Sequence, residues 1–466
     1  MPSLMRSFST VALSTLCSRV LGLGRDMLMA AYFGAARTAD VFYISFMIPN
    51  LFRRLVAEGA LTISFIPVYT ESLIHDGEEE SLKLAQKVVT VQAIFMLAII
   101  SAGIIFSPQI MKIFFGYDNS PEILSLSINL TRMMFPYLFF AGFVAFAMGY
   151  LNSHGHFFSP AFAPVLLNVG MITGIVYFSR YFKEPVYGAA LGVLAGGFLQ
   201  FIIQIPYMIK KGFVFRVSVD FRHPGIKKIF KMLTPALFGI AVYQINVLVS
   251  NMLATMIPSG SVSYIYYTSR LTELVLGVFI VSIGNVILPE MSRLTALDDS
   301  MKFKKLFTDT VSSVLFLAVP ASVALIAAGI PVISVIFMHG KFTYNDVLLT
   351  YYSLVSASFG IIFVAALRIT TPAFYAMKDT KTPVIAATVS LAVNVAAGYT
   401  LMHTPLKHAG LTLANTISAV VQSAILLVML NRKTGGIDSS RIFKSLMKFT
   451  AASAVMALLI VWIGSF

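Results

Sequence analysis

Residues 8–33 read FSTVALSTLCSRVLGLGRDMLMAAYF, an apolar stretch long enough to cross a bilayer that nevertheless contains Arg19, Arg25 and Asp26. A spanning helix needs ~20 apolar residues, and a charge at bilayer depth costs ~2.5–3.5 kcal/mol. Residues 40–72 form another apolar stretch of spanning length that contains charged residues, namely Asp40, Arg53, Arg54 and Glu58. Charges placed in this way must face an internal, hydrated cavity, and a cationic cavity inside a membrane protein indicates an anionic substrate.

The composition is that of a polytopic membrane protein. The 466 residues are 58% hydrophobic and 12% charged, whereas soluble domains carry about 25% charged residues. The mean hydropathy is +0.84. Continuous apolar runs such as 88–106 favour helices over the alternating strands of a β-barrel. The single Cys17 excludes a disulfide scaffold.

The apolar runs predict thirteen membrane spans. They are 8–33, 40–72, 88–106, 125–150, 160–179, 187–209, 232–257, 264–289, 310–338, 347–377, 383–402, 409–430 and 449–464. With a cytoplasmic N-terminus, the inside loops hold 21 of the 34 Lys and Arg residues and the outside loops six. This asymmetry follows the positive-inside rule, so the net charge of +14 reflects topology and not nucleic-acid binding.

The spans fall into two groups of six. We predict an N-terminal lobe over 1–209, a basic cytoplasmic linker over 210–231, a C-terminal lobe over 232–430, and a basic loop with an additional helix over 431–466. Asn168 and Asn394 lie 226 residues apart, and Pro67 and Pro289 lie 222 apart. These offsets indicate a parallel repeat of the kind that holds substrate between two rocking halves. The predicted fold is therefore two six-helix lobes around a central cationic cavity, plus at least one extra C-terminal helix.

Each charged residue in the spans has two possible roles, binding a ligand or forming a structural ion pair. Arg19 and Asp26 are two helical turns apart and share a face. Arg25 either binds a phosphate through its planar fork or pairs with Asp26 or Asp40 and staples two spans together.

The charged residues further along the chain have the same two possible roles. Arg54 and Glu58 have the i,i+4 spacing of a helical pair, while Arg53 lacks a local acid and is the better ligand candidate. Both arginines could instead snorkel to an interface. Arg270 either joins the ligand set or pairs with Glu273. Arg132 and Arg368 are the remaining arginines inside spans, and Arg132 is close enough to an outer end to snorkel.

No P-loop, GxSxG or HExxH pattern occurs, so neither ATP hydrolysis nor hydrolase chemistry is indicated. We expect a transporter that is not an enzyme and uses no cofactor.

The sequence resembles the MurJ/MviN family of bacterial lipid II flippases, within the multidrug/oligosaccharidyl-lipid/polysaccharide exporter superfamily. The resemblance covers nearly the whole chain, with one span fewer than the family usually has. It is carried by residues 18–26, by Phe33-Gly34 and Asp40, by residues 49–67, by Tyr266-Tyr267 with Arg270-Leu271, and by residues 374–383.

The resemblance implies diphosphate-binding residues at Arg19, Arg25, Arg53 and Arg270, and gating or charge-pairing residues at Asp26, Asp40, Arg54 and Glu58. It implies lipid II, the undecaprenyl-diphosphate-linked disaccharide-pentapeptide, as the substrate. The lipid tail would lie beside the last helices. Some members bind sodium through intramembrane acids, but the matching spans here offer Asn246, Ser250, Asn251 and Asn394 instead, so we expect no metal site.

Three functions remain open at this point. The first is a lipid II flippase of the bacterial cytoplasmic membrane, working by alternating access as a monomer among membrane lipids, with cell-wall synthesis enzymes as candidate partners. The second is an exporter of another lipid-linked glycan or a drug antiporter of the same superfamily. The third is a non-transporting scaffold for cell-wall enzymes.

Overall fold

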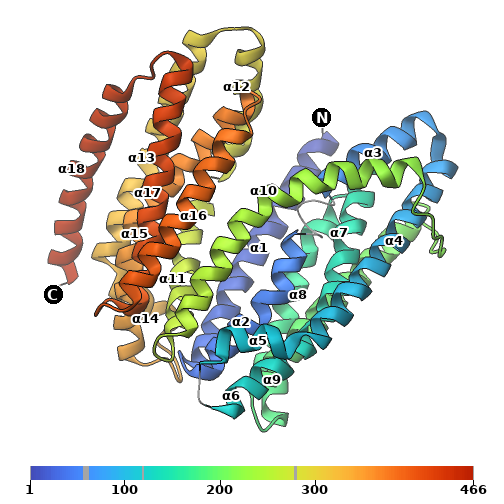
Figure 1. Ribbon diagram of the computed structural model, residues 1–466, viewed down its shortest axis with the longest axis horizontal. Coiled ribbons are helices and arrows are strands. Elements are labelled where there is room, and N and C mark those ends of the chain that lie inside the picture. Colours follow the sequence, from blue (N-terminus) through green and yellow to red (C-terminus); the bar gives the residue numbers. More distant parts are fainter. Residues whose placement is uncertain (1, 56–61, 118–119, 278–280, 465–466) are drawn as a thin grey trace. The chain divides into compact units, whose positions relative to one another are not determined.

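The chain is almost entirely helical. The computed structural model describes residues 2–55, 62–117, 120–277 and 281–464, and over these residues it contains α-helices and a short 3-10 helix, η2 (Phe178–Tyr181), but no strand (Figure 1). The chain divides into two compact units, Met1–Gln244 and Ile245–Phe466. The all-helical, two-unit architecture confirms the predicted fold class, while the lobe and linker boundaries and the central cavity stay predictions.

The described residues of the first unit form nine α-helices and the start of a tenth. They are α1 (Pro2–Phe33), α2 (Arg37–Phe52), α3 (Thr62–His75), α4 (Gly77–Ile105), α5 (Ser107–Phe115), α6 (Pro121–Met134), α7 (Tyr137–Ser153), α8 (Phe158–Val176), α9 (Val186–Lys210) and α10 (Pro224–Thr255), which continues into the second unit. Between α9 and α10 the chain is non-helical over 211–223.

The described residues of the second unit form the end of α10 and eight further helices. These are α11 (Ser261–Val275), α12 (Val281–Ala296), α13 (Ser300–Ala327), α14 (Gly329–Phe337), α15 (Tyr344–Ala376), α16 (Lys381–Met402), α17 (Lys407–Thr434) and α18 (Ser439–Gly464). The predicted extra C-terminal helix is thus present as α18. It packs along α13 through an Arg441–Asp309 ion pair of 2.7 Å and an edge-to-face contact between Phe449 and Phe316.

Each predicted span falls on one helix or on two consecutive helices. Nine spans in the described part of the chain are long and apolar enough to cross a membrane. The other four predicted spans fall on α1, α10 and the interrupted pairs α2/α3 and α11/α12. By the repeat, these are the first two spans of each half.

The second span of each half is interrupted at an equivalent place. After α2 the chain makes a π-helical turn at residues 53–55, and after α11 it makes another at residues 276–277. The helices that follow, α3 and α12, contain Pro67 and Pro289. π-helical turns are rare and occur often at functional sites. Their recurrence supports the parallel repeat predicted from the sequence.

A seam of glycines joins α8 to α9. A Cβ atom added to Gly192 would lie 2.7 Å from the carbonyl oxygen of Gly170, and one added to Gly170 would lie 2.4 Å from the Cα of Gly196. Small residues let helix backbones approach closely where lipid provides no hydrophobic drive. The seam therefore makes α8 and α9 one rigid support, and α8 carries a residue of the candidate site.

Candidate functional site

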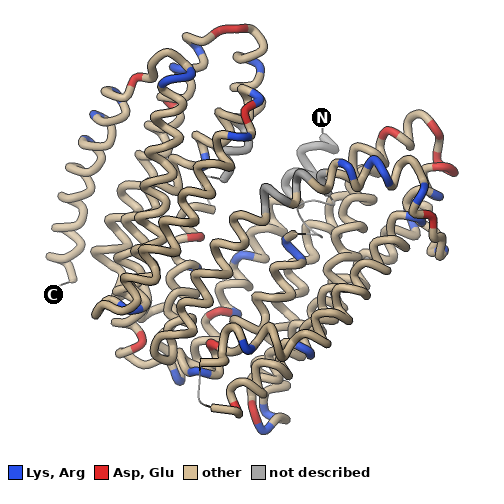
Figure 2. The backbone as a smooth tube through the Cα atoms, viewed as in Figure 1, with Lys and Arg blue, Asp and Glu red and all other residues tan. Residues whose placement is uncertain are grey.

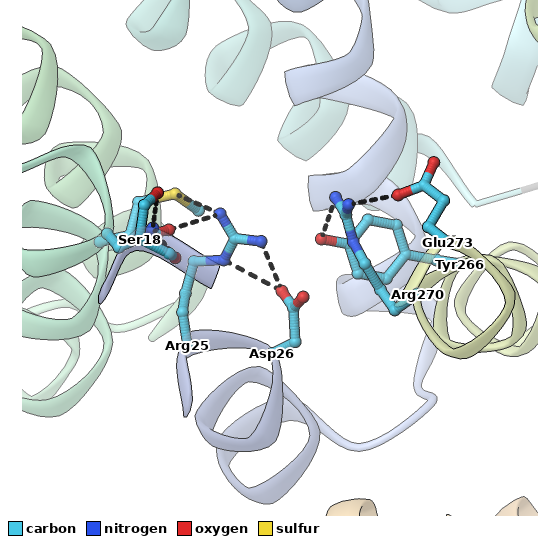
Figure 3. A network of polar contacts seen from close by, with 8 residues as sticks. Ser18, Arg25, Asp26, Tyr266, Arg270 and Glu273 are labelled. Atoms are coloured by element: carbon cyan, nitrogen blue, oxygen red, sulfur yellow. Dashed lines mark hydrogen bonds and ion pairs between the residues drawn. The ribbon is translucent and has the colours of Figure 1, made fainter. Parts of the chain in front are cut away.

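The first part of the site is the side chain of Arg25 in α1. Its Nε and Nη2 donate to Oδ1 of Asp26 at 3.0 and 2.7 Å, and its Nη1 donates to Oδ1 of Asn168 at 3.0 Å (Figure 3). The Asp26 side chain is 3% exposed and that of Arg25 11%. The pairing of Arg25 with Asp26 that the sequence left open is therefore present.

Asn168 in α8 holds α1 at two points. Besides accepting from Arg25, its Nδ2 donates to the backbone oxygen of Ser18 at 2.9 Å. Gly22 lies between these two points, and a Cβ atom there would stand 3.7 Å from the amide of Asn168. The helix is thus held at residues seven apart, which lie on one face. Sequence reasoning used Asn168 only as a marker of the repeat and missed this role.

The second unit contains the equivalent clasp. Asn394 in α16 donates from Nδ2 to Oδ1 of Asn246 and, at 2.9 Å, to Oγ of Ser250, both in α10. Asn394 is equivalent to Asn168 at the offset of 226, and α10 is equivalent to α1. The two asparagines are therefore hydrogen-bonded to the first helix of each repeat. In the first unit this clasp includes an arginine and a carboxylate, whereas here its bonded groups are amides and a hydroxyl.

Arg53 stands at the C-terminal end of α2, where the π-helical turn begins. Its Nε donates to Oδ1 of Asn50 at 2.8 Å. Pro49 in the preceding turn cannot donate a backbone hydrogen bond. Asn50, three residues earlier in the chain, therefore helps to orient the guanidinium of Arg53.

The remaining candidates of the first unit are placed as follows. Asp40 is fully buried in the first turn of α2, Arg19 is exposed on α1, and Arg54 is half-buried. Glu58 lies outside the described residues, so its pairing with Arg54 stays a prediction. Arg132, which was expected to snorkel, donates from Nε to Oγ of Ser107 at 2.9 Å.

In the second unit, taken by itself, the candidate residue is Arg270 in α11. Its Nη1 donates to Oε2 of Glu273 at 2.9 Å and its Nη2 to the hydroxyl of Tyr266 at 3.0 Å, while the guanidinium carbon lies 4.7 Å from the centre of the Tyr266 ring (Figure 3). The pairing with Glu273 considered from the spacing is thus formed. The Arg270 side chain is still 33% exposed, so it remains accessible to a ligand.

Figure 2 shows most Lys, Arg, Asp and Glu residues near the ends of the helices and only a few part-way along them. A guanidinium that faces a carboxylate can bind a phosphate in the same way, because each group presents two oxygen acceptors to the two parallel N–H donors of the arginine fork. Asp26 and Glu273 are the carboxylates paired with Arg25 and Arg270 in this structure. Within the described residues, no three His, Cys, Asp or Glu side chains gather as metal ligands would.

Comparison with known proteins agrees with this architecture. A solved structure of a multidrug resistance MATE family transporter in an inward-facing conformation superposes with a TM-score of 0.77 at 15% identity, covering 90% of this chain and 94% of that one. A solved structure of lipid II flippase MurJ in an inward closed conformation gives a TM-score of 0.82 at 28% identity, covering 98% and 93%. The fold and its intramembrane arginines define a multi-span transporter of the exporter superfamily that contains both.

The sequence comparisons are more specific. Residues 29–466 match the family described as lipid II flippase MurJ. The chain is 34% identical to lipid II flippase MurJ of Burkholderia cenocepacia, over 99% of this chain and 90% of the relative. It is 35% identical to the probable lipid II flippase MurJ of Vibrio cholerae, over 91% and 82%. The chain belongs to the MurJ family, and it is a multi-pass protein of the bacterial inner membrane.

Proposed function

We propose that this protein moves lipid II from the inner to the outer leaflet of the bacterial cytoplasmic membrane, for peptidoglycan assembly. Membership of the MurJ family supports the substrate. The observation in the molecule that supports it most is the buried Arg25–Asp26–Asn168 network, because a pre-oriented guanidinium inside a span suits a diphosphate. Transport of this kind makes and breaks no covalent bond, so the chain acts as a transporter and not as an enzyme.

In this proposal the diphosphate is bound by Arg19, Arg25, Arg53 and Arg270. Asp26 and Asp40, together with Arg54 and Glu58, balance the charge when substrate is absent. Binding exchanges the Arg25–Asp26 pair for an Arg25–phosphate pair. The cost of exposing one buried carboxylate is then offset by a doubly charged ligand. The inside-negative potential favours the return of an empty, positively charged site at ~2.3 kcal/mol per charge per 100 mV.

The two other functions make different demands on the same residues. An antiporter for cationic drugs requires acids where this chain carries arginines. A scaffold for cell-wall enzymes requires no buried arginine at all, since the charges would only cost free energy. An exporter of another lipid-linked diphosphate glycan shares the chemistry and differs only in the headgroup.

Complementation separates these functions. We expect the gene to restore growth to a bacterium depleted of its own lipid II flippase, and we expect labelled lipid II to reach the outer leaflet of those cells. Growth without movement of lipid II would favour the scaffold. Failure of both, with the protein present in the membrane, would favour a different glycan.

The orientation of the chain can be tested independently. We propose a cytoplasmic N-terminus, on the basis of the distribution of Lys and Arg between the loops. In a Cys17→Ser background, Lys341→Cys should react with an impermeant thiol reagent in intact cells. Lys304→Cys should react only after permeabilisation. The opposite pattern would invert the topology and with it the direction of transport.

A further inference from the structure

The segment between α9 and α10 is an extended strap held firmly at both ends. Gly212 adopts a left-handed conformation with φ of 83° and ends α9. The next residue, Phe213, is buried at 2% exposure and packs edge-to-face on Phe146 and Tyr150. At the other end Pro224 starts α10. We call residues 213–222 the strap.

Two backbone groups and one carboxylate of the strap bond to α4. The backbone oxygen of Val214 accepts from Nε2 of Gln86 at 2.8 Å, and the backbone N–H of Ser218 donates to Oγ1 of Thr90 at 3.2 Å. Asp220 forms an ion pair of 2.9 Å with Lys87. The hydrogen bond from Lys87 keeps the pKa of Asp220 below its usual value, so the carboxylate is charged when it meets α4.

Beyond the buried Phe213, the apolar side chains of the second half of the strap face outward. Val217 is 85% exposed, Val219 56% and Phe221 48%, and they alternate with the bonded positions 218 and 220. In an extended chain successive side chains point to opposite sides. A strand in water places its apolar side inward and its polar side outward, and residues 217–221 do the reverse. This inversion suits apolar surroundings on the outer side.

The place of the strap along α4 indicates what those surroundings are. Its contacts on α4, from Gln86 to Thr90, lie where the predicted apolar run of that helix begins at Val88. The strap is therefore level with a membrane boundary. Arg216 and Arg222 flank its apolar face and are exposed, and the region 210–231 holds seven Lys and Arg residues. Basic residues beside an apolar face match the anionic lipid headgroups of a bilayer surface.

We propose that the strap is an interfacial membrane anchor. It inserts Val217, Val219 and Phe221 among the acyl chains of the leaflet next to it, and it binds the phosphates of anionic phospholipids through Arg216 and Arg222. The anchor fixes the segment between α9 and α10 at the membrane surface. This role is separate from the binding of a transported lipid, since it requires none of the arginines within the spans.

Tryptophan fluorescence tests the insertion. The chain has a single tryptophan, Trp462, so a Trp462→Phe parent accepts new reporters. Phe221→Trp and Val217→Trp would be placed one at a time in the full-length protein. Each would be reconstituted in phosphatidylcholine–phosphatidylglycerol vesicles with brominated or ordinary acyl chains. Glu79→Trp, whose position on α4 has a side chain 84% exposed, is the aqueous control.

We expect both strap reporters to be quenched by brominated chains and protected from iodide, and the Glu79→Trp control to show the opposite. Phe221→Trp is a conservative aromatic change, so it reports even if Val217→Trp folds poorly. Strap reporters quenched by iodide would place the strap in water. Reporters quenched by neither reagent would mean that protein, such as a second copy, covers it. Either result would overturn the proposal.

A second measurement tests the anionic preference. Quenching of Phe221→Trp by brominated phosphatidylglycerol should exceed that by brominated phosphatidylcholine at the same mole fraction. Arg216→Gln with Arg222→Gln should reduce this ratio to one, whereas Lys302→Gln with Lys305→Gln, which removes the same charge elsewhere, should leave it unchanged. A ratio of one in the parent, or an equal fall in the control, would refute binding of phosphate by the strap arginines.

Discussion

Arg25→Ala is expected to abolish complementation while the protein still reaches the membrane in normal amounts. The guanidinium can offer two charge-assisted hydrogen bonds to a phosphate, each worth ~1.5–3 kcal/mol. Their loss corresponds to about a hundredfold or greater loss of affinity. Arg25→Lys should also perform poorly, because a point charge lacks the bidentate fork. Arg53→Ala should behave similarly if Arg53 belongs to the same ligand set. Growth and membrane abundance are the two measurements.

A paired variant separates binding from a structural role. Arg25→Ala leaves Asp26 buried without its guanidinium partner, and a buried unpaired charge is itself destabilising. Arg25→Ala with Asp26→Asn removes that penalty. If Arg25 only staples the helix, the double variant should recover function. If it binds substrate, the double variant should stay inactive. Arg132→Ala, which removes an arginine bonded to Ser107 outside the network, should grow normally. Full growth of Arg25→Ala itself would end the diphosphate assignment.

Gly192→Ala is expected to destabilise the protein strongly, although the substitution adds only one methyl group. Its Cβ would meet the backbone of α8 at 2.7 Å from the oxygen of Gly170, and a backbone atom cannot rotate away as a side chain does. Overpacking of a tight contact costs ~1–3 kcal/mol per site. The expected result is a lower apparent melting temperature of the purified protein in detergent, together with weaker expression.

Gly24→Ala provides the matched control. Gly24 is also a glycine inside a spanning helix, but a Cβ atom there has no neighbour within 4 Å. Alanine favours the helix by ~0.8–1.0 kcal/mol over glycine. The two variants should therefore move the melting temperature in opposite directions. Equal melting temperatures would mean that the seam between α8 and α9 is looser than its geometry implies.

Most of the fold could be predicted because lipid imposes a simple rule on sequence. A spanning helix must be apolar over its length, and each of the thirteen predicted runs falls on observed helices. The interruptions were harder to predict. The break after Met134 lies next to Pro136, which a sequence can reveal, because proline disfavours helix at the residue before it. The π-helical turn at 53–55 carries no such signal.

The sequence predicted the candidate residues and offered two of their pairings as alternatives. The structure forms both, Arg25 with Asp26 and Arg270 with Glu273. Neighbouring residues on a helix do not normally face each other, but a long arginine can fold back onto the next side chain. Asn168 could not be found from local spacing at all, because it lies 143 residues from Arg25. Its match with Asn394 was the only sequence signal.

The π-helical turns that follow α2 and α11 give each half a place where a helix can change its register. A π turn holds an extra residue compared with an α turn. If the π turn moved to a neighbouring position along the helix, the residues between its old and new positions would shift by one place in the helix. Their side chains would then rotate about the helix axis by ~100°. The backbone on either side would stay where it is. Arg54 lies within the first of these turns. A charge could thus be turned from one face of its helix to another by a local rearrangement, and the repeat places the same device in the other half.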